Sequence, residues 1–237
     1  VPEQASVAAE ISMTRALAGV PTVSLEILNF TRLPNAVFRR FGGLAYHYID
    51  RGSRRLLMSM TLLSLQKQMR YFSIKDPFEK TAIDSLLQAM DECTRHTLTP
   101  EKLEKVEKCL KDSDESPLLQ NKLHDLSLLR ACYSALLADA YDDPGDDMQR
   151  MNRVLQTNSF FANTAVYLDG FYSMTPQQYQ TMRHIFNQSD SVSVTFACPF
   201  LQEEADLIRT GLYKHARLLT RLASPEEPQI FSLPEID

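Results

Sequence analysis

A long helical block interrupts a chain that otherwise alternates strand and helix patterns. Between about residues 54 and 150 the apolar residues recur at helical spacing. On both sides of this block, segments with strand periodicity are followed by segments with helical periodicity. The simplest architecture with this order is an α/β domain that carries a helical insertion. We therefore expect three parts, residues 1–53, 54–150 and 151–237, of which the first and third form one α/β body.

The first part is predicted to contain two helices and one strand. Residues 5–17 have helical spacing and end near Gly19. In residues 21–30 apolar and polar side chains alternate, which predicts a strand with one buried face. Residues 33–41 predict a second helix, which Gly42-Gly43 would stop.

The insertion is predicted to be all helix. Leu56, Met60 and Leu63 share one face of its first helix, and a second helix follows around residues 83–90. Thr99-Pro100-Glu101 predicts the start of a third, because Thr caps helices and Pro and acids favour the first turn. A fourth is expected over residues 117–141 before the turn at 142–147.

The third part returns to alternating strands and helices. The apolar run at residues 165–168 is typical of a strand that is buried on both faces of a parallel sheet. Thr175-Pro176-Gln177-Gln178 has the pattern of a capping box and predicts a helix start. Residues 192–196 alternate as another strand, and residues 202–222 predict the last helix.

Composition excludes several classes of protein. The net charge is −5, so the chain as a whole is not a basic nucleic-acid coat. No apolar run approaches the roughly 20 residues of a membrane span. The four cysteines form no C-x-x-C pair, which argues against a disulfide framework or a zinc site and favours thiols in a reducing cytoplasm. Because the sequence starts at Val1 without a signal-peptide pattern and ends without a helix cap, we expect a segment of a longer chain.

One stretch departs from this acidic balance. Residues 31–55 carry a net charge of +5, and aromatic residues are interleaved with the arginines. Guanidinium groups beside aromatic rings suit phosphates and stacked bases. The alternative is a solvated helix face above ordinary core aromatics. The arginines are Arg32, Arg39, Arg40, Arg51, Arg54 and Arg55.

The second chemical feature is Asp169-Gly170, directly after the predicted strand at 165–168. An acid there lies at the carboxyl edge of a parallel sheet, where ligands bind, and P-loop NTPases hold magnesium at that position. The alternative is a plain turn. The chain contains no G-x-x-x-x-G-K-[ST] loop, H-E-x-x-H or G-x-S-x-G motif, so we expect no catalytic residue in it.

The sequence resembles the N-terminal region of the AddB (RexB) family, subunits of bacterial helicase–nuclease complexes that resect double-strand DNA ends. The most specific match is Val166-Tyr167-Leu168-Asp169-Gly170-Phe171 followed by Thr175-Pro176-Gln177-Gln178-Tyr179. The other matching segments are Val1-Pro2-Glu3-Gln4, Glu26-Ile27-Leu28-Asn29-Phe30-Thr31-Arg32-Leu33, Tyr48-Ile49-Asp50-Arg51 and residues 126–141.

This resemblance implies a P-loop NTPase (RecA-like) fold, namely helicase domain 1A truncated at its N-terminus with an inserted all-helical 1B subdomain at residues 54–150. Asp169 would be the Walker B aspartate, and Gly170 stands where helicases have a catalytic glutamate. A glycine cannot orient the attacking water, which implies a degenerate site without ATP hydrolysis. The expected DNA-binding residues are Asn29, Phe30, Thr31, Arg32, Arg39 and Arg40.

The implied function is binding or scanning of single-stranded DNA, with recognition of the recombination hotspot signal Chi, in homologous recombination and DNA repair. The alternatives are a truncated active P-loop ATPase and a helical docking scaffold for the motor subunit. The implied partners are single-stranded DNA and an AddA/RexA-type motor-nuclease subunit in the bacterial cytoplasm, with no membrane. No cofactor is expected here, because the family's nuclease, its Mg²⁺ and its iron–sulfur cysteines lie downstream.

Overall fold

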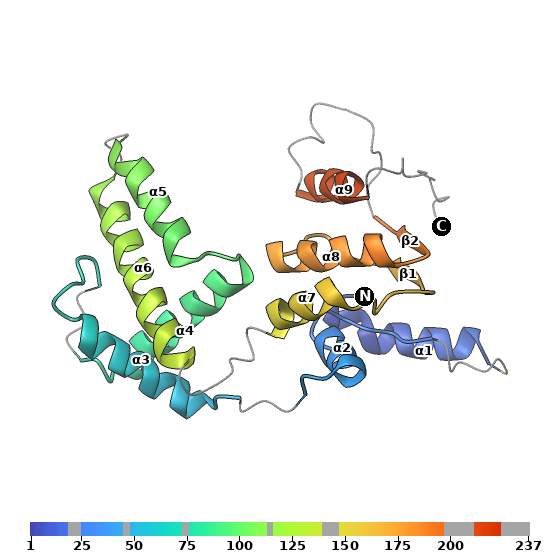
Figure 1. Ribbon diagram of the computed structural model, residues 1–237, viewed down its shortest axis with the longest axis horizontal. Helices are drawn as coiled ribbons and strands as arrows, with labels where there is room; N and C mark the ends of the chain where they lie inside the picture. Colours follow the sequence, from blue (N-terminus) through green and yellow to red (C-terminus); the bar gives the residue numbers. More distant parts are fainter. Residues whose placement is uncertain are drawn as a thin grey trace. The chain divides into compact units, whose positions relative to one another are not determined.

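The computed structural model describes residues 1–18, 25–44, 48–72, 76–112, 116–138, 147–196 and 211–223. The chain divides into two compact units (Figure 1). Unit 1 comprises Val1–Gly42 and Met148–Asp237, and unit 2 comprises Gly43–Asp147. The boundaries between the units thus lie after Gly42 and after Asp147. The sequence analysis predicted them after residues 53 and 150.

Unit 1 mixes helices and strands, and the described part of unit 2 is helical. The elements are η1 (Glu3–Ala5), α1 (Ser6–Ala16), α2 (Leu33–Phe41), α3 (Arg51–Leu65), α4 (Lys80–Arg95), α5 (Pro100–Asp112), α6 (Pro117–Ala138), α7 (Asp147–Thr157), β1 (Ala165–Leu168), α8 (Pro176–Gln188), β2 (Ser191–Val194) and α9 (Gly211–Leu222). The order is compatible with the expected α/β class, although the described residues are mostly helical. None of the described helices is long and apolar enough to cross a membrane.

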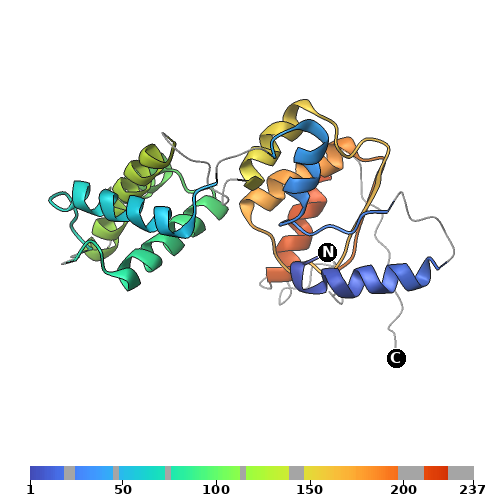
Figure 2. The same ribbon diagram turned by 90° about the horizontal axis from the view of Figure 1, so that it is seen from below.

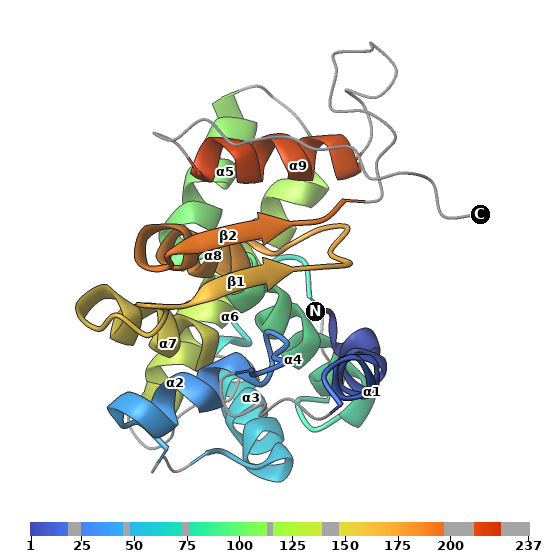
Figure 3. The ribbon, with the colours of Figure 1, turned by 90° about the vertical axis from the view of Figure 1, so that its right-hand side faces the viewer.

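β1 and β2 form a small parallel sheet, and α8 connects them. Ala165 pairs with Ser191 and Leu168 pairs with Val194. Figure 3 shows the two strands side by side, with α2 and α7 beyond β1 and α9 beyond β2. The expectation that β1 is buried on both faces is wrong, because the Tyr167 side chain is 73% exposed. Only the face that carries Leu168 packs into the core of unit 1.

The strand expected over residues 21–30 is absent from its described part. Residues 21–24 lie outside the described residues, and residues 25–30 are not assigned to a strand. A strand is defined by its ladder of hydrogen bonds to a neighbour. In the described part of the chain, residues 25–28 have one backbone hydrogen bond, from the Val1 nitrogen to the Leu28 carbonyl oxygen (3.1 Å). The segment then turns at Asn29, so its alternating pattern yields no ladder.

Local signals set the helix ends of unit 1 as expected. α2 ends at Gly42, whose φ of +89° is a conformation that favours glycine. The capping box at the start of α8 is confirmed. The Thr175 hydroxyl accepts a hydrogen bond from the Gln178 N–H (3.3 Å), and the Gln178 side chain accepts one from the Thr175 N–H (2.8 Å). α9 matches the described part of the expected last helix, residues 211–222.

The core of unit 2 lies between α3, α4 and α6. Met58, Met90 and Leu129 are each at most 1% exposed within it. The face that Leu56, Met60 and Leu63 share is not the core face, since these side chains are 58%, 44% and 49% exposed. α3 therefore carries apolar residues on two faces, of which unit 2 buries only the one that includes Met58.

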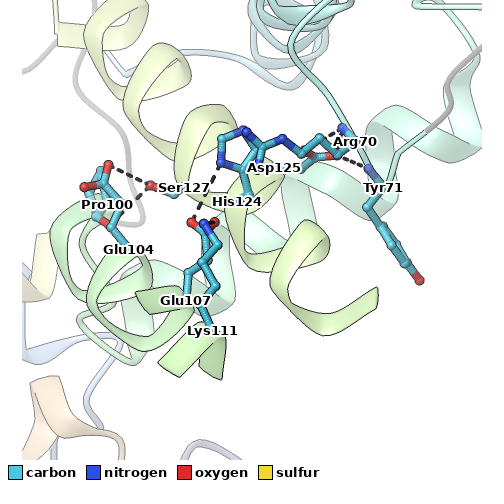
Figure 4. Close-up of polar contacts among 9 residues, drawn as sticks. All are labelled: Arg70, Tyr71, Pro100, Glu104, Glu107, Lys111, His124, Asp125 and Ser127. Carbon is cyan, nitrogen blue, oxygen red and sulfur yellow. Dashed lines mark hydrogen bonds and ion pairs between the residues drawn. The ribbon is translucent and has the colours of Figure 1, made fainter. Parts of the chain in front are cut away.

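Two acidic side chains are buried in unit 2 (Figure 4). The Asp125 carboxylate on α6 is fully buried and accepts hydrogen bonds from successive backbone N–H groups of residues 70–72 at 2.7–3.0 Å. Glu107 on α5 is 5% exposed and pairs with Lys111 (2.5 Å) and His124 (3.7 Å). These contacts fix the α3–α4 connection and join α5 to α6.

Candidate nucleic-acid interface

The turn before α2 presents two of the predicted DNA-binding side chains to solvent. Asn29 is 7% exposed, and its side-chain oxygen accepts hydrogen bonds from the Thr31 N–H (3.1 Å) and the Arg32 N–H (2.8 Å). Its carbonyl oxygen also accepts from the Leu33 N–H (2.9 Å), which starts the helix. Asn29 thus shapes the turn with the oxygen that would otherwise face a ligand, and Thr31 and Arg32 are left exposed.

Both exposed side chains contact acids from the start of the chain. The Thr31 hydroxyl donates to the Glu3 carboxylate (3.3 Å), and the Arg32 guanidinium pairs with the Glu10 carboxylate. The Arg32 and Glu10 side chains are 55% and 43% exposed, so solvent screens this pair. Figure 2 shows η1 and α1, which carry these acids, along one side of unit 1. A phosphate approaching Arg32 therefore meets a carboxylate already in place.

An aromatic pair lies beside this turn. The rings of Phe30 and Phe171 are 5.3 Å apart at an interplanar angle of 59°, and both residues are half-buried. Edge-tilted pairs at this distance are favourable packing. The pair joins the turn before α2 to the loop after β1. Phe30 is therefore partly a core residue, and a base could reach only its remaining exposed surface.

Asp169 lies at the carboxyl end of β1, as expected. Its carboxylate accepts a hydrogen bond from the Thr195 hydroxyl, and the Thr195 N–H donates to the Leu168 carbonyl oxygen (2.9 Å). Gly170 follows with φ +77°, a conformation that L-residues rarely adopt. A Cβ on Gly170 would lie 3.4 Å from the Pro2 ring, an ordinary contact. The backbone conformation, more than lack of space, therefore favours glycine here.

Among the described residues, Asp169 does not belong to a cluster of metal-ligating side chains. Mg²⁺ needs near-octahedral oxygen ligands, usually one or two carboxylates together with bound phosphates and waters. In the described ranges no group of three or more His, Cys, Asp or Glu side chains could hold a metal ion. Asp169 is exposed, and its carboxylate accepts a hydrogen bond from the Thr195 hydroxyl. We derive no metal-dependent step from this arrangement.

The other two predicted arginines lie at the end of α2. Arg39 is exposed and, within the described residues, its guanidinium makes no hydrogen bond or ion pair. The Arg40 guanidinium donates to the Phe160 carbonyl oxygen (3.3 Å) and lies 5.5 Å from the Phe41 ring and 5.8 Å from the Phe160 ring. Arg40 is thus held by aromatic neighbours.

Arg32 and Arg39 lie on one face of α2. Asn35 is also exposed, and the three positions are spaced by three and four residues, which places them along one side of a helix. We call Arg32, Asn35 and Arg39 the α2 stripe. Phe30 and Thr31 lie next to Arg32, at the N-terminal end of the α2 stripe, and Arg40 lies on a neighbouring face of the helix.

The remaining three arginines of the basic stretch pair with carboxylates within unit 2. Arg55 makes a two-pronged contact with Asp84 (2.8 and 2.7 Å), and Arg51 reaches the same carboxylate (3.5 Å). Arg54 pairs with Asp91 and donates to the Tyr133 hydroxyl (3.2 Å). These pairs tie α3 to α4, so half of the basic stretch is neutralised within the fold.

The motif around Asp50 is also structural. The Asp50 carboxylate caps α3 by accepting from the N–H groups of Gly52 (2.7 Å) and Ser53 (3.0 Å). The hydrogen bonds from Ser53 lower the pKa of Asp50 below its ordinary value of 3.8. Two of the aromatic residues of this stretch, Tyr46 and His47, lie outside the described residues.

Sequence reasoning missed the partners of the interface. Glu3 and Glu10 were not singled out, and no local pattern links them to Thr31 and Arg32 across 28 and 22 residues. Phe171 was noted only as part of a motif. Its position directly after the Asp-Gly pair at a sheet edge was the one sequence feature that could have indicated its place in the interface.

Comparison with known proteins identifies a family. The family described as "ADDB, N-terminal" matches residues 1–223. Three similar curated relatives are each named as a subunit of an ATP-dependent helicase/deoxyribonuclease. The protein of Acetivibrio thermocellus is 25% identical over 97% of this chain and 20% of its own length. The protein of Ruminiclostridium cellulolyticum is 24% identical over 90% of this chain and 18% of its own length. The protein of Desulforudis audaxviator is 29% identical over 82% of this chain and 17% of its own length. The chain thus spans about a fifth of the length of these relatives.

Proposed function

Because this chain belongs to the AddB N-terminal family, as its sequence resemblance indicated, we propose that it is a single-stranded-DNA-binding part of a DNA-repair helicase–nuclease subunit. The observation that carries the proposal is the α2 stripe, which has exposed Arg32 next to Phe30 of the Phe30–Phe171 pair at one end and exposed Arg39 at the other. Arginines on an exposed helix face neutralise phosphates, and aromatic surface beside them accepts bases.

We further assign unit 1 to a RecA-like helicase domain 1A and unit 2 to its inserted 1B subdomain. The supporting observations are the parallel β1–α8–β2 unit, the acid at the carboxyl end of β1, and a helical unit that begins and ends between elements of unit 1. The partner in this proposal is an AddA/RexA-type motor-nuclease subunit, since the names of the relatives describe one subunit of a larger enzyme.

DNA binding at the α2 stripe has a built-in competitor. Glu10 occupies Arg32 in the absence of DNA, so a phosphate must replace or share this contact. Exposed ion pairs are worth only about 0.2–1 kcal/mol, which a phosphate contact can exceed. The pair therefore holds Arg32 in place without blocking it. Such moderate contacts suit a strand that moves past the surface, as scanning for Chi requires.

The proposed role does not include ATP hydrolysis. Gly170 supplies no carboxylate next to Asp169, and its positive φ disfavours any replacement that would. No observation in the described residues favours the alternative of an active ATPase. Turnover that is stimulated by single-stranded DNA and abolished by Asp169→Ala would contradict this part of the proposal.

The test of DNA binding compares two arginines in matched settings. Arg32 and Arg95 are each 55% exposed and each pairs with a half-exposed glutamate, but Arg95 lies on α4 of unit 2. Arg32→Ala should weaken binding of a single-stranded oligonucleotide severalfold, and Arg95→Ala should leave it near the wild-type value. Equal effects of the two substitutions would contradict the assignment of the α2 stripe.

A second candidate function, a docking scaffold for the partner subunit, is favoured by the exposed face of α3. Leu56, Met60 and Leu63 follow the i, i+4, i+7 spacing by which a helix anchors in a groove. Replacing all three by serine should then reduce co-purification of the partner subunit while the melting temperature of the chain is unchanged. Undiminished co-purification would leave DNA binding as the sole proposed role.

A further inference from the structure

α9 carries a basic face that the α2 stripe does not include. Lys214, Arg217 and Arg221 are all exposed, and their spacing of three and four residues places them along one side of the helix. α9 contains no Asp or Glu, and neither does α8. This is unusual in a chain that has 30 acidic residues among 237 and a net charge of −5. We call Lys214, Arg217 and Arg221 the α9 face.

The opposite side of α9 is anchored in the core, which fixes the direction of the α9 face. Tyr213, Ala216 and Leu219 are at most 4% exposed. The Tyr179 hydroxyl on α8 hydrogen-bonds His215 Nδ1 (2.5 Å), and burial lowers the pKa of His215 below its ordinary value of 6.5. His215 is therefore a neutral part of the anchor, and the positive charge of α9 lies on its exposed side.

The cations of the α9 face differ in their surroundings from Arg54 and Arg55 of unit 2. Arg54 and Arg55 are occupied by carboxylates that tie helices together. In the described ranges, neither Lys214 nor Arg221 lies within ion-pair distance of a carboxylate. The Arg217 guanidinium lies 5.9 Å from the Tyr213 ring, which restrains its side chain along the helix. Arg217 is thus positioned along its own helix, and the exposed Lys214 and Arg221 side chains present their charge to solvent.

We propose that the α9 face binds the phosphate backbone of DNA as a second contact surface. The proposal rests on the proposed function, because the chemistry itself identifies only a polyanion with closely spaced charges. Figures 1 and 3 show α9 on the side of α8 away from α7 and α2, so this surface is separate from the α2 stripe. The face offers cations and no exposed aromatic side chain, which suits phosphates rather than bases.

The test removes three exposed positive charges in each of two variants. The first variant carries Lys214→Gln, Arg217→Gln and Arg221→Gln. The matched control carries Lys67→Gln, Lys105→Gln and Lys108→Gln, which removes three exposed cations from unit 2. Each lost phosphate contact lowers the slope of log affinity against log salt by about 0.7 for single strands. The slope of the first variant should therefore be smaller by about 2. Over a roughly fourfold rise in salt, its affinity deficit should then shrink about 20-fold.

The outcomes separate this inference from the proposed function. If Arg32→Ala weakens binding but the α9 variant behaves like the control, the α9 inference is wrong and the function stands. If the wild-type chain binds no DNA, both fail. The α9 variant would also be tested for binding to polyglutamate of the same length as the DNA. If it loses as much affinity for polyglutamate as for DNA, the ligand is an acidic protein and the DNA assignment is overturned. A further variant with Arg217→Lys and Arg221→Lys keeps the charge and should keep the slope, which controls for misfolding.

Discussion

Replacing Asp125 by alanine should destabilise unit 2 by about 3–5 kcal/mol. The Asp125 carboxylate is fully buried and is the acceptor for the successive N–H groups of Arg70, Tyr71 and Phe72. Hydrogen bonds to a charged group contribute roughly 1.5–3 kcal/mol each, so three would give an upper bound of about 9. Arg70 and Tyr71 have exposed side chains, so water can reach part of the loop and roughly halve this figure.

Urea denaturation followed by circular dichroism measures this change. With a denaturant slope of about 2 kcal/mol per molar, Asp125→Ala should lower the midpoint of unit 2 by about 2 M. Asp125→Asn should cost less, since its carbonyl oxygen can still accept two of the three N–H groups. Asp76→Ala is the control. Among the described residues, that exposed carboxylate accepts a single hydrogen bond, from the Phe78 N–H (2.9 Å), so its loss should cost no more than about 1 kcal/mol.

Hydrogen exchange provides the local readout. The amides of residues 70–72 should lose their protection in Asp125→Ala even under conditions where unit 2 stays folded. A midpoint that moves no more than in Asp76→Ala, with unchanged exchange at these amides, would refute the argument that this buried carboxylate organises the α3–α4 connection.

Three further predictions concern single sites. Gly170→Glu should lower the melting temperature of unit 1 and create no ATPase, because φ +77° costs an L-residue about 1–2 kcal/mol; ATP turnover in this variant would be unexpected. The Arg55 guanidinium holds the pKa of Asp84 below 3.8, so the stability from this pair is present above that pH and lost below it. Arg55→Gln should therefore flatten the acid limb of a stability–pH curve, and an unchanged limb would refute the pairing. Burial lowers the pKa of His215, so unit 1 should lose stability as the pH falls below about 6.5, and His215→Asn should reduce that loss in melts across the pH range.

Signals confined to a few neighbouring residues predicted the fold best. The Gly42-Gly43 stop of α2 and the Thr175–Gln178 capping box at α8 depend on contacts within one turn, so sequence alone could place them. The two strands were also predicted, from a short apolar run and a second alternating segment.

Predictions that depended on distant partners were less complete. α3 has apolar residues on two faces, and periodicity could not tell that Met58 rather than Met60 enters the core. The alternation at residues 25–30 was real, yet no neighbouring strand completes a ladder in the described residues. Arg55 was placed in a DNA-binding stretch because its partner, Asp84, lies 29 residues away on another helix. Charge density along a sequence does not reveal which charges the fold neutralises.

The salt dependence of single-stranded DNA binding tests the central claim most directly. The affinity of the full chain would be measured across a series of salt concentrations for the wild type and for the double variant Arg32→Ala, Arg39→Ala. If both arginines of the α2 stripe contact phosphates, the slope of log affinity against log salt should fall by about 1.4 in the variant. A variant that binds with the wild-type slope and affinity would show that the α2 stripe is only a solvated face and would contradict the account.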